Sequence, residues 1–348
     1  MRAAERALVV GGAGFVGANL VARLLADGCR RIVVVDNFLS AERDSIPADP
    51  AVDIREGSIA DDAVLARLGD EFDVVFHLAT YHGNQSSIAD PLADHANNLF
   101  ATLKLFQHIA GFRALRRVVY ASTGCALAEK GATTAAPVTE DGPIPLDFDS
   151  PYQISKVAGE MYAIWFHRAH ALPIVRARFQ NVYGPGEVLG AGRWRGTPAT
   201  IWRNVVPTFV YRALKKQSLP VHGDGRSTRD FICVDDVVEG LLRCAAPDTP
   251  AGDVFNLASG VETPIVALAQ QINELTGNVA GVERVPARTW DHSIARVGSP
   301  EKAAQRLGFA ARIPLAEGLA RTVRWSTANL DRIERAIRRH AAQCPVEF

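Results

Sequence analysis

The segment from Ser150 to Lys156, Ser-Pro-Tyr-Gln-Ile-Ser-Lys, contains residue types that can transfer a proton. Pro151 suits the first turn of a helix, because its φ is already helical and its missing N–H is not needed there; Ser150 is then the expected cap. On such a helix Tyr152 and Lys156 are four residues apart and share one face. A phenol has an ordinary pKa of about 10, so a neighbouring cation would help it to act as a base near pH 7. The same spacing also occurs on ordinary solvated helix faces.

A strand, a glycine-rich turn and a helix are predicted at the beginning of the chain. Residues 7–10 are apolar, residues 11–17 have a glycine at every third position, and a helical pattern follows. Such glycines allow the backbone to approach a pyrophosphate at the helix N-terminus. The next strand, 32–35, ends in Asp36, where an acid can bind both ribose hydroxyls of NAD and repel the 2′-phosphate of NADP. These features predict an NAD site; a purely structural glycine turn is the alternative.

Four more strands are predicted at 52–54, 74–78, 117–122 and 173–178, separated by helical patterns that include 92–110 and 152–171. Alternation at this spacing indicates the α/β class, with a Rossmann-type doubly wound parallel sheet. In such sheets ligands bind beyond the carboxyl ends of the strands. His77 and Thr123 both come at strand ends. We interpret His77 as a packed histidine, whereas the Thr123 hydroxyl could hold a sugar oxygen or form a local turn.

The regular alternation of strand and helix ends near residue 187. We therefore predict an NAD-binding domain with the catalytic helix at 1–186. Residues 187–348 are expected to form mainly a smaller C-terminal substrate-binding lobe, parts of which return to the main sheet. Residues 190–203 are rich in glycine, arginine and tryptophan, and an arginine-rich helix at 330–340 is most simply a solvated face.

Composition excludes several classes of function. The 348-residue chain has a formal net charge of zero and 22% charged residues, which argues against nucleic acid or an anionic membrane as a partner. Its five cysteines are scattered without a CxxC pair, so neither a metal site nor a disulfide framework is expected. No apolar run reaches about 18 residues. We expect a cytoplasmic protein.

Together these motifs resemble the extended short-chain dehydrogenases/reductases, specifically the nucleotide-sugar epimerase/dehydratase family that includes proteins like UDP-glucose 4-epimerase. The resemblance covers nearly the whole chain. Its motifs are Gly11-x-x-Gly14-x-x-Gly17, Asp36, His77-Leu78-Ala79, Asn98 with Thr102, Ser122-Thr123, Tyr152-x-x-x-Lys156, the segment 178–185, the segment 223–231 and Arg288-x-x-Asp291.

The resemblance implies a role for each matching residue. Tyr152 would be the acid/base, Lys156 would hold the nicotinamide ribose and lower the phenol pKa, and Thr123 would bind the reacting sugar hydroxyl. The other cofactor-binding residues implied are Gly11, Gly14, Phe15, Val16, Gly17, Asp36, Asn37, Ser58, Ile59, Leu78, Ala79 and Asn98. The implied substrate contacts are Ser87, Thr123, Asn181, Arg229 and Arg288. The family also implies a UDP-sugar substrate and a homodimer paired through the helices near 92–110 and 152–170.

Within the family, the residues after Thr123 favour 4-epimerisation through a transient 4-keto sugar. Gly124-Cys125 stands where the family's 4,6-dehydratases have Asp-Glu, and a uronate decarboxylase has Glu at the position of Cys125. The sugar would be a UDP-hexose, an N-acetylhexosamine, for which the small Ala295 leaves room, or a uronate. A dehydratase, a decarboxylase or a 4-keto reductase remains an alternative, as does a sensor of NAD or nucleotide sugars without catalysis.

Overall fold

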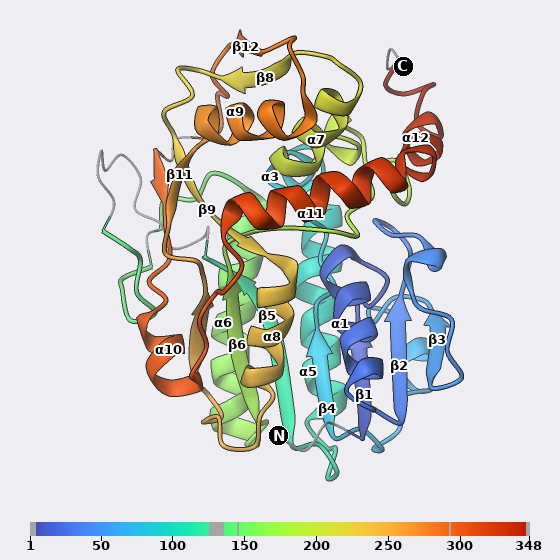
Figure 1. Cartoon of the computed structure of the whole chain (residues 1–348). Coiled ribbons are helices and arrows are strands. Elements are labelled where there is room, and N and C mark those ends of the chain that lie inside the picture. Colours follow the sequence, from blue (N-terminus) through green and yellow to red (C-terminus); the bar gives the residue numbers. More distant parts are fainter. Residues whose placement is uncertain (1–4, 125–135, 145, 292–293, 346–348) are drawn as a thin grey trace.

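The computed structural model describes residues 5–124, 136–144, 146–291 and 294–345. A sheet of seven parallel strands forms its centre, in the order β10-β6-β5-β4-β1-β2-β3 (Figure 1). The strands are β1 (Arg6–Val10), β2 (Arg31–Asp36), β3 (Val52–Glu56), β4 (Val74–His77), β5 (Arg117–Thr123), β6 (Ile174–Phe179) and β10 (Val254–Leu257). The six predicted strands are confirmed within a residue or two. The fold class, α/β with a Rossmann-type sheet, is confirmed as well.

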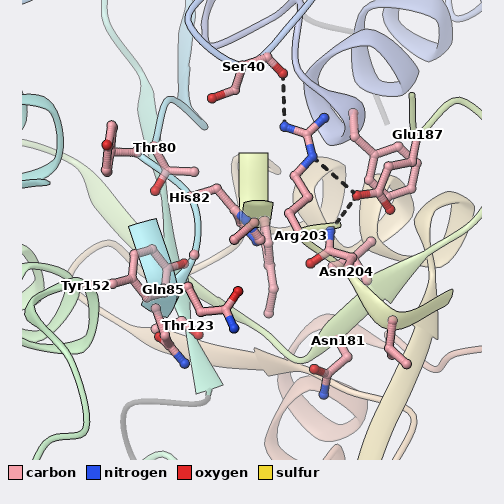
Figure 2. Close-up of a pocket in the computed structure, with 18 of the residues that line it drawn as sticks. Ser40, Thr80, His82, Gln85, Thr123, Tyr152, Asn181, Glu187, Arg203 and Asn204 are labelled. Carbon is pink, nitrogen blue, oxygen red and sulfur yellow. Dashed lines mark hydrogen bonds and ion pairs between the residues drawn. The ribbon is translucent and has the colours of Figure 1, made fainter. Parts of the chain in front are cut away.

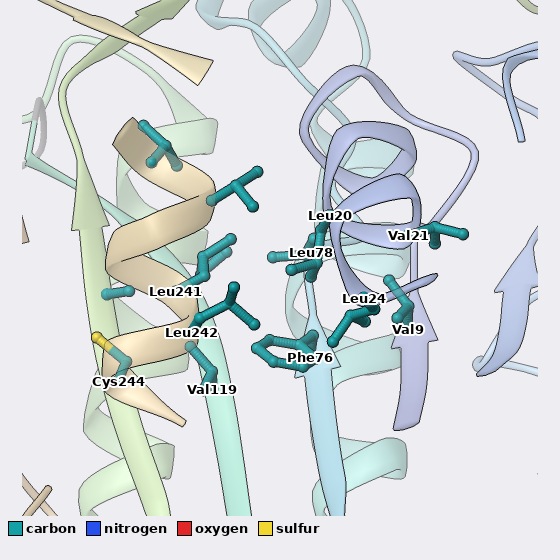
Figure 3. Packing of buried hydrophobic residues seen from close by; sticks show 14 of the residues in the cluster. Val9, Leu20, Val21, Leu24, Phe76, Leu78, Val119, Leu241, Leu242 and Cys244 are labelled. Atoms are coloured by element: carbon teal, nitrogen blue, oxygen red, sulfur yellow. The ribbon is translucent and has the colours of Figure 1, made fainter. Parts of the chain in front are cut away.

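Alternate residues of each strand supply the cores on the two faces of this sheet, as the period of two in a strand requires. Ala7 and Val9 pack toward one core, and Leu8 and Val10 toward the other. Helices α1 (Phe15–Ala26) and α8 (Val234–Cys244) cover the first face, where Leu20, Leu24 and Leu241 belong to the same core as Phe76 (Figure 3). Helices α2 (Asp62–Leu65), α5 (Ala101–Ile109) and α6 (Pro151–His170) cover the other face. The sheet is therefore doubly wound.

The predicted helix at 92–110 is present, but its hydrogen-bonding pattern changes along its length. Helix α3 (Asn84–Ala89) precedes it, and α4 (Pro91–Asp94) runs into a π-helical stretch, η2 (His95–Phe100), before α5 begins. A π-helical turn widens the backbone spiral and changes which side chains face inward. Asn98 lies within this stretch.

A second layer lies beyond the carboxyl ends of the main strands and contains several short strands. Strands β7 (Asn181–Tyr183), β11 (Glu262–Pro264) and β13 (Ala295–Arg296) pair with β9 (Thr228–Cys233), while β8 (Leu219–His222) pairs with β12 (Val282–Val285). A third core packs them against α7 (Val205–Leu214), α9 (Ile265–Thr276) and α11 (Leu315–Ala328). The chain returns to the main sheet through α8 and β10, followed later by α10 (Glu301–Leu307).

The C-terminal helix α12 (Leu330–Arg338) corrects one expectation. It is not simply a solvated face, because Ile333, Ala336 and Ile337 are buried in a fourth core with Val188 and Ile201. Only the arginine-bearing side of this helix is solvated. Among the described residues, no helix is both long enough and apolar enough to span a membrane.

Candidate active site

A cleft of about 980 Å³ lies between the carboxyl edge of the main sheet and the second layer. It occupies the place where strand order reverses, since β1 has β2 on one side and β4 on the other. Its volume is at the upper end for small-molecule sites, which leaves room for a dinucleotide and a second ligand. Of the fourteen predicted cofactor-binding residues, all but Asn98 line this cleft. They are Gly11, Gly14, Phe15, Val16, Gly17, Asp36, Asn37, Ser58, Ile59, Leu78, Ala79, Tyr152 and Lys156.

The glycine turn needs its glycines for steric reasons. Gly11 has φ +82°, and a Cβ there would come within 2.5 Å of the Ala79 nitrogen. A Cβ on Gly17 would lie 2.2 Å from the Gly11 carbonyl oxygen, so α1 could not pack so close to the turn. Gly14 caps α1 in an extended conformation without a side-chain hydrogen bond. The first turn of α1 therefore presents backbone amides to the cleft, which suits a diphosphate.

Asp36 holds this turn from the end of β2. Its two carboxylate oxygens accept hydrogen bonds from the Ala13 and Phe38 amides, each at 2.9 Å. Burial raises the pKa of Asp36, and the bond from the Phe38 amide opposes that rise. Because each carboxylate oxygen has a second lone pair, Asp36 can still accept from ribose hydroxyls while it fixes the turn. The residues present thus fit the dinucleotide NAD.

Helix α6 places Tyr152 and Lys156 in the cleft as predicted. The Ser150 hydroxyl accepts a hydrogen bond from the Gln153 amide at 3.4 Å and so caps the helix, directly before Pro151. Lys156 is buried, its Nζ donates to the Ala121 carbonyl at 3.0 Å, and it lies 5.4 Å from the centre of the Tyr120 ring. Burial lowers the pKa of Lys156 to about 8. The ammonium is therefore still charged near pH 7, one helical turn from Tyr152.

Thr123, at the end of β5, lines the same cleft as Tyr152, and Figure 2 shows the two side chains close together. The next position has no space for a larger residue in this arrangement. A Cβ on Gly124 would lie 1.9 Å from Nε2 of Gln180, whose amide occupies that volume. Cys125, the other residue on which the prediction of the reaction depends, lies outside the described residues, as do those that follow it through 135.

His77 is a packed residue, which confirms the interpretation from sequence. Its Nε2 is 2.8 Å from the Thr102 hydroxyl, and its ring packs against Tyr120 and Phe106. Burial lowers the pKa of His77 to about 3, with a smaller contribution from the Lys156 charge, so the imidazole is neutral. It does not line the cleft.

Two predicted contact residues, Asn98 and Ser87, do not line the cleft. The Asn98 carboxamide accepts from the Tyr81 amide at 2.6 Å and donates to the Tyr81 carbonyl at 3.2 Å, so it fixes the loop after β4. Asn97, its neighbour, lines the cleft instead. The Ser87 hydroxyl is buried and donates to the Asn84 carbonyl at 2.8 Å. Both residues therefore lie behind the loop that forms the cleft wall.

The second layer supplies the opposite wall, with the other three predicted substrate contacts. Asn181, on β7, donates to the Asp230 carbonyl at 3.1 Å. Arg229, on β9, is buried and pairs with Asp291 at 2.9 Å. Arg288 is exposed and its guanidinium carbon lies 5.4 Å from the centre of the Trp290 ring. This wall is rich in guanidinium groups, which suit a second phosphate-bearing ligand.

Several residues of the cleft were not predicted from the sequence. Thr80 and His82, on the loop after β4, and Gln85, in α3, surround Tyr152 in Figure 2. The His82 ring centre is 6.1 Å from that of Tyr152, and burial, with the charges of Arg203 and Arg195, lowers the pKa of His82 to about 3. The only signal in the sequence was their position just after a buried strand.

Glu187 and Arg203 form a second unpredicted feature, on the side of the cleft facing α1. Arg203 Nε lies 3.9 Å from a carboxylate oxygen of Glu187, which also accepts a hydrogen bond from the side-chain Nδ2 of Asn204 (Figure 2). Burial raises the pKa of Glu187, and the Arg203 charge opposes that rise. The sequence indicated only that the segment was unusual in composition.

Comparison with known proteins agrees with this geometry. The model of the NAD dependent epimerase/dehydratase family matches residues 7–258. A UDP-glucose 4-epimerase of Mycolicibacterium smegmatis is 34% identical over 91% of this chain and 97% of the relative. A UDP-N-acetyl-alpha-D-glucosaminuronate decarboxylase of Bacillus cytotoxicus is 28% identical over 92% and 97% of the two chains. A dTDP-glucose 4,6-dehydratase of Actinoplanes sp. is 29% identical over 92% and 98%.

Solved structures are similar over almost the whole chain. The enzyme WbmF of Bordetella bronchiseptica, in complex with NAD+, is 54% identical and superposes with a TM-score of 0.86 over 97% of both chains. The same enzyme has also been solved with NAD+ and UDP. The epimerase Mth375 of Methanothermobacter thermautotrophicus is 38% identical, with a TM-score of 0.87 over 95% of this chain and 94% of that one. This chain therefore belongs to the NAD dependent epimerase/dehydratase family, and NAD is its cofactor.

Proposed function

We propose that the protein is a nucleotide-sugar 4-epimerase that acts on a UDP-sugar through a transient 4-keto intermediate. The observation that carries this proposal is the arrangement around Thr123: Tyr152 and Lys156 share its cleft, while the Gln180 amide fills the space beside Gly124. A dehydratase of the family needs an acid at that position. Epimerisation needs none, because the keto sugar only has to turn and take the hydride back on its other face.

In this proposal Tyr152 takes the proton of the sugar C4 hydroxyl, and Thr123 hydrogen-bonds the same oxygen. The bound nicotinamide supplies the hydride acceptor. The Lys156 ammonium stabilises the phenolate from one turn away, and its buried position, bonded to the Ala121 carbonyl, keeps it in place. When the hydride returns to the sugar, Tyr152 returns the proton to the C4 oxygen. The cofactor and the side chains are then as they were before the reaction, and no other reagent is needed.

Arg229, Arg288 and Asn181 are proposed to bind the diphosphate and nucleoside of the substrate. The relative WbmF, solved with UDP, supports a uridine nucleotide. The relatives that are decarboxylases and dehydratases support the alternative reactions on the same scaffold. The sugar in this proposal is a hexose, an N-acetylhexosamine or a uronate.

The test is proton NMR in D2O with UDP-glucose, UDP-N-acetylglucosamine, UDP-glucuronate and dTDP-glucose in separate tubes and no added cofactor. We expect one sugar to convert to its C4 epimer without uptake of deuterium. A 4-keto-6-deoxy product, release of CO2 or a requirement for added NADH would instead identify the dehydratase, decarboxylase or reductase. A protein that binds NAD and UDP but converts none of these sugars would favour a sensor.

We also propose a homodimer. The adjacent helices α4, η2 and α6 carry five large apolar residues that are between 47% and 80% exposed: Leu92, Phe100, Ile154, Met161 and Trp165. Exposed apolar residues gathered on one surface indicate an interface. Light scattering should give the mass of two chains, and the double variant Met161→Glu, Trp165→Glu should give that of one. The free Cys29, Cys233, Cys244 and Cys344 are in keeping with a reducing cytoplasm.

A further inference from the structure

The segment 187–204 crosses from the second layer to the cofactor side of the cleft. It begins after Gly186, where a Cβ would lie 3.9 Å from the Phe15 ring on α1, and Asn19 of α1 donates to the Pro185 carbonyl at 3.2 Å. It then runs over the loop after β2. The Arg193 amide donates to the Leu39 carbonyl at 3.0 Å, and a Cβ on Gly192 would lie 2.3 Å from that oxygen.

Three arginines of this segment bond carbonyl groups of the loops that border the cofactor half of the cleft. Arg193 donates to the Asn37 carbonyl at 3.0 Å and Arg203 to that of Ser40 at 3.1 Å, both after β2. Arg195 donates to the His82 carbonyl at 3.0 Å, after β4, and lies over the Tyr81 ring. The segment thus ties together two loops that flank the glycine turn.

Arg203 differs from the other two because it lines the cleft. Its side chain is nine-tenths buried. Its Nη1 and Nη2 bond the Ser40 and Val188 carbonyls, and further N–H groups of the guanidinium are available to a ligand. Within the described residues, its Nε makes no hydrogen bond, and neither does the second carboxylate oxygen of Glu187. Figure 2 shows Arg203 between Ser40 and Glu187.

The C-terminal helix supports the segment from behind. Apolar residues of α12 pack on Val188, Leu189 and Ile201, and His340 bonds the Gly190 carbonyl at 2.9 Å. Glu42 accepts from both the Gly192 amide and Arg339, so the loop after β2, the segment and the end of the chain meet at one carboxylate. The segment is therefore held by a packed core and does not hang freely over the cleft.

We infer that the segment 187–204 is a clasp that retains NAD. In this inference Arg203 is a further cofactor-binding residue, whose positive charge lies beside the cofactor's diphosphate. The glycine turn offers the diphosphate backbone amides, whereas a guanidinium adds a charge-assisted bond. In this proposal the loop after β2 must separate from the clasp before NAD leaves the glycine turn, so clasp opening limits NAD release.

The experiment measures how fast bound NAD leaves the full-length protein. Protein loaded with radiolabelled NAD is mixed with excess unlabelled NAD, and retained label is followed with time. Arg203→Met keeps the length of the side chain and removes its charge, and we expect release at least about tenfold faster. The double variant Glu187→Gln, Arg203→Met should release NAD as fast as Arg203→Met does. It does not leave a buried carboxylate without its arginine. Arg193→Met breaks one exposed contact and should accelerate release about two- to threefold.

Controls separate the clasp from general loss of structure and from the proposed reaction. Arg306→Met removes an exposed arginine of α10, outside the cleft, and should release NAD at the wild-type rate. Affinity for UDP, measured by calorimetry, should be unchanged in Arg203→Met. Folded variants, by circular dichroism, that all release NAD within twofold of the wild type would overturn the inference. Loss of UDP affinity with unchanged NAD release would assign Arg203 to the substrate instead. Neither outcome depends on which sugar is converted.

Discussion

The two walls of the cleft recognise ligands by different means. The Rossmann wall presents the amides of a glycine turn, one carboxylate, Asp36, and the Tyr152–Lys156 pair on a capped helix. The opposite wall presents guanidinium groups, including Arg229 and Arg288, on short strands and irregular segments. Backbone amides can bind a ligand whatever side chains the residues carry. The glycine turn of the first wall therefore depends mainly on the few glycines that allow its conformation. The second wall depends on individual side chains and the contacts that hold them.

Substitution of Tyr152 should have the largest effect on chemistry while leaving both walls in place. Tyr152→Phe removes the oxygen that we propose exchanges the proton, so we expect turnover to fall by about 10²- to 10⁴-fold. Bound NAD, measured after denaturation of the purified protein, should equal that of the wild type. Activity within tenfold of the wild type would remove Tyr152 from the mechanism.

The second prediction removes the support behind the Rossmann wall. Glu160, one turn after Lys156, accepts two hydrogen bonds from Arg178 at 2.9 and 2.8 Å, and Arg176 lies 3.6 Å away. All three side chains are buried, so Glu160→Ala should lower the free energy of unfolding by about 3–5 kcal/mol in urea titrations. Glu317→Ala breaks the exposed pair with Arg321, which solvent screens, and should change the free energy of unfolding far less. Equal losses would contradict the structural role of Glu160.

Two substitutions at Asp36 distinguish its charge from its support of the glycine turn. Asp36→Ala removes both acceptors for the Ala13 and Phe38 amides, so NAD affinity should fall about tenfold or more and the preference over NADP should vanish. Asp36→Asn keeps one acceptor and should lose less affinity for NAD, but it also loses the repulsion of the 2′-phosphate. Binding of both cofactors is measured by calorimetry. An unchanged preference in both variants would mean that the ribose is recognised elsewhere.

The lowered pKa of Lys156 predicts a pH dependence. Without cofactor most of its amine is protonated near pH 7, and this charge is lost as the pH rises through about 8, whereas an exposed lysine stays charged to about 10. If the ammonium helps to hold NAD, affinity should fall above pH 8, by at most tenfold per pH unit. The Lys156→Met variant should bind NAD less tightly than the wild type at pH 7, and its affinity should not fall further above pH 8. Lys215→Met, which removes a lysine paired with Glu334, should keep the wild-type profile.

The smallest predicted effect concerns the opposite wall. Arg288 is exposed beside Trp290, so solvent screens its charge, and Arg288→Met should weaken UDP binding about three- to tenfold. NAD release should not change. Arg284, exposed on β12 and outside the cleft, gives the matched control. If Arg288→Met accelerated NAD release by the same factor by which it weakened UDP binding, the two walls would not be separate in function.

The sequence predicted the Rossmann wall better than the opposite one for physical reasons. Buried parallel strands are continuous apolar runs, and the Ser150-Pro151 cap is a local signal, so the strands and α6 could be located in advance. The contact predicted at Asn98 did not come from a local signal, because the π-helical stretch decides that Asn97 faces the cleft. The roles of Arg203 and α12 arise from contacts across large separations in the chain, which composition cannot reveal.

Strand β10 has a consequence for the order in which the protein can be completed during synthesis. It pairs with β6 along the edge of the main sheet, but it follows β7, α7, β8, β9 and α8 in the chain. As a nascent chain leaves the ribosome, the backbone groups of β6 therefore wait for their partner until most of the second layer has emerged. A truncated product that stops near residue 186 would expose this edge and would be prone to aggregate with other copies.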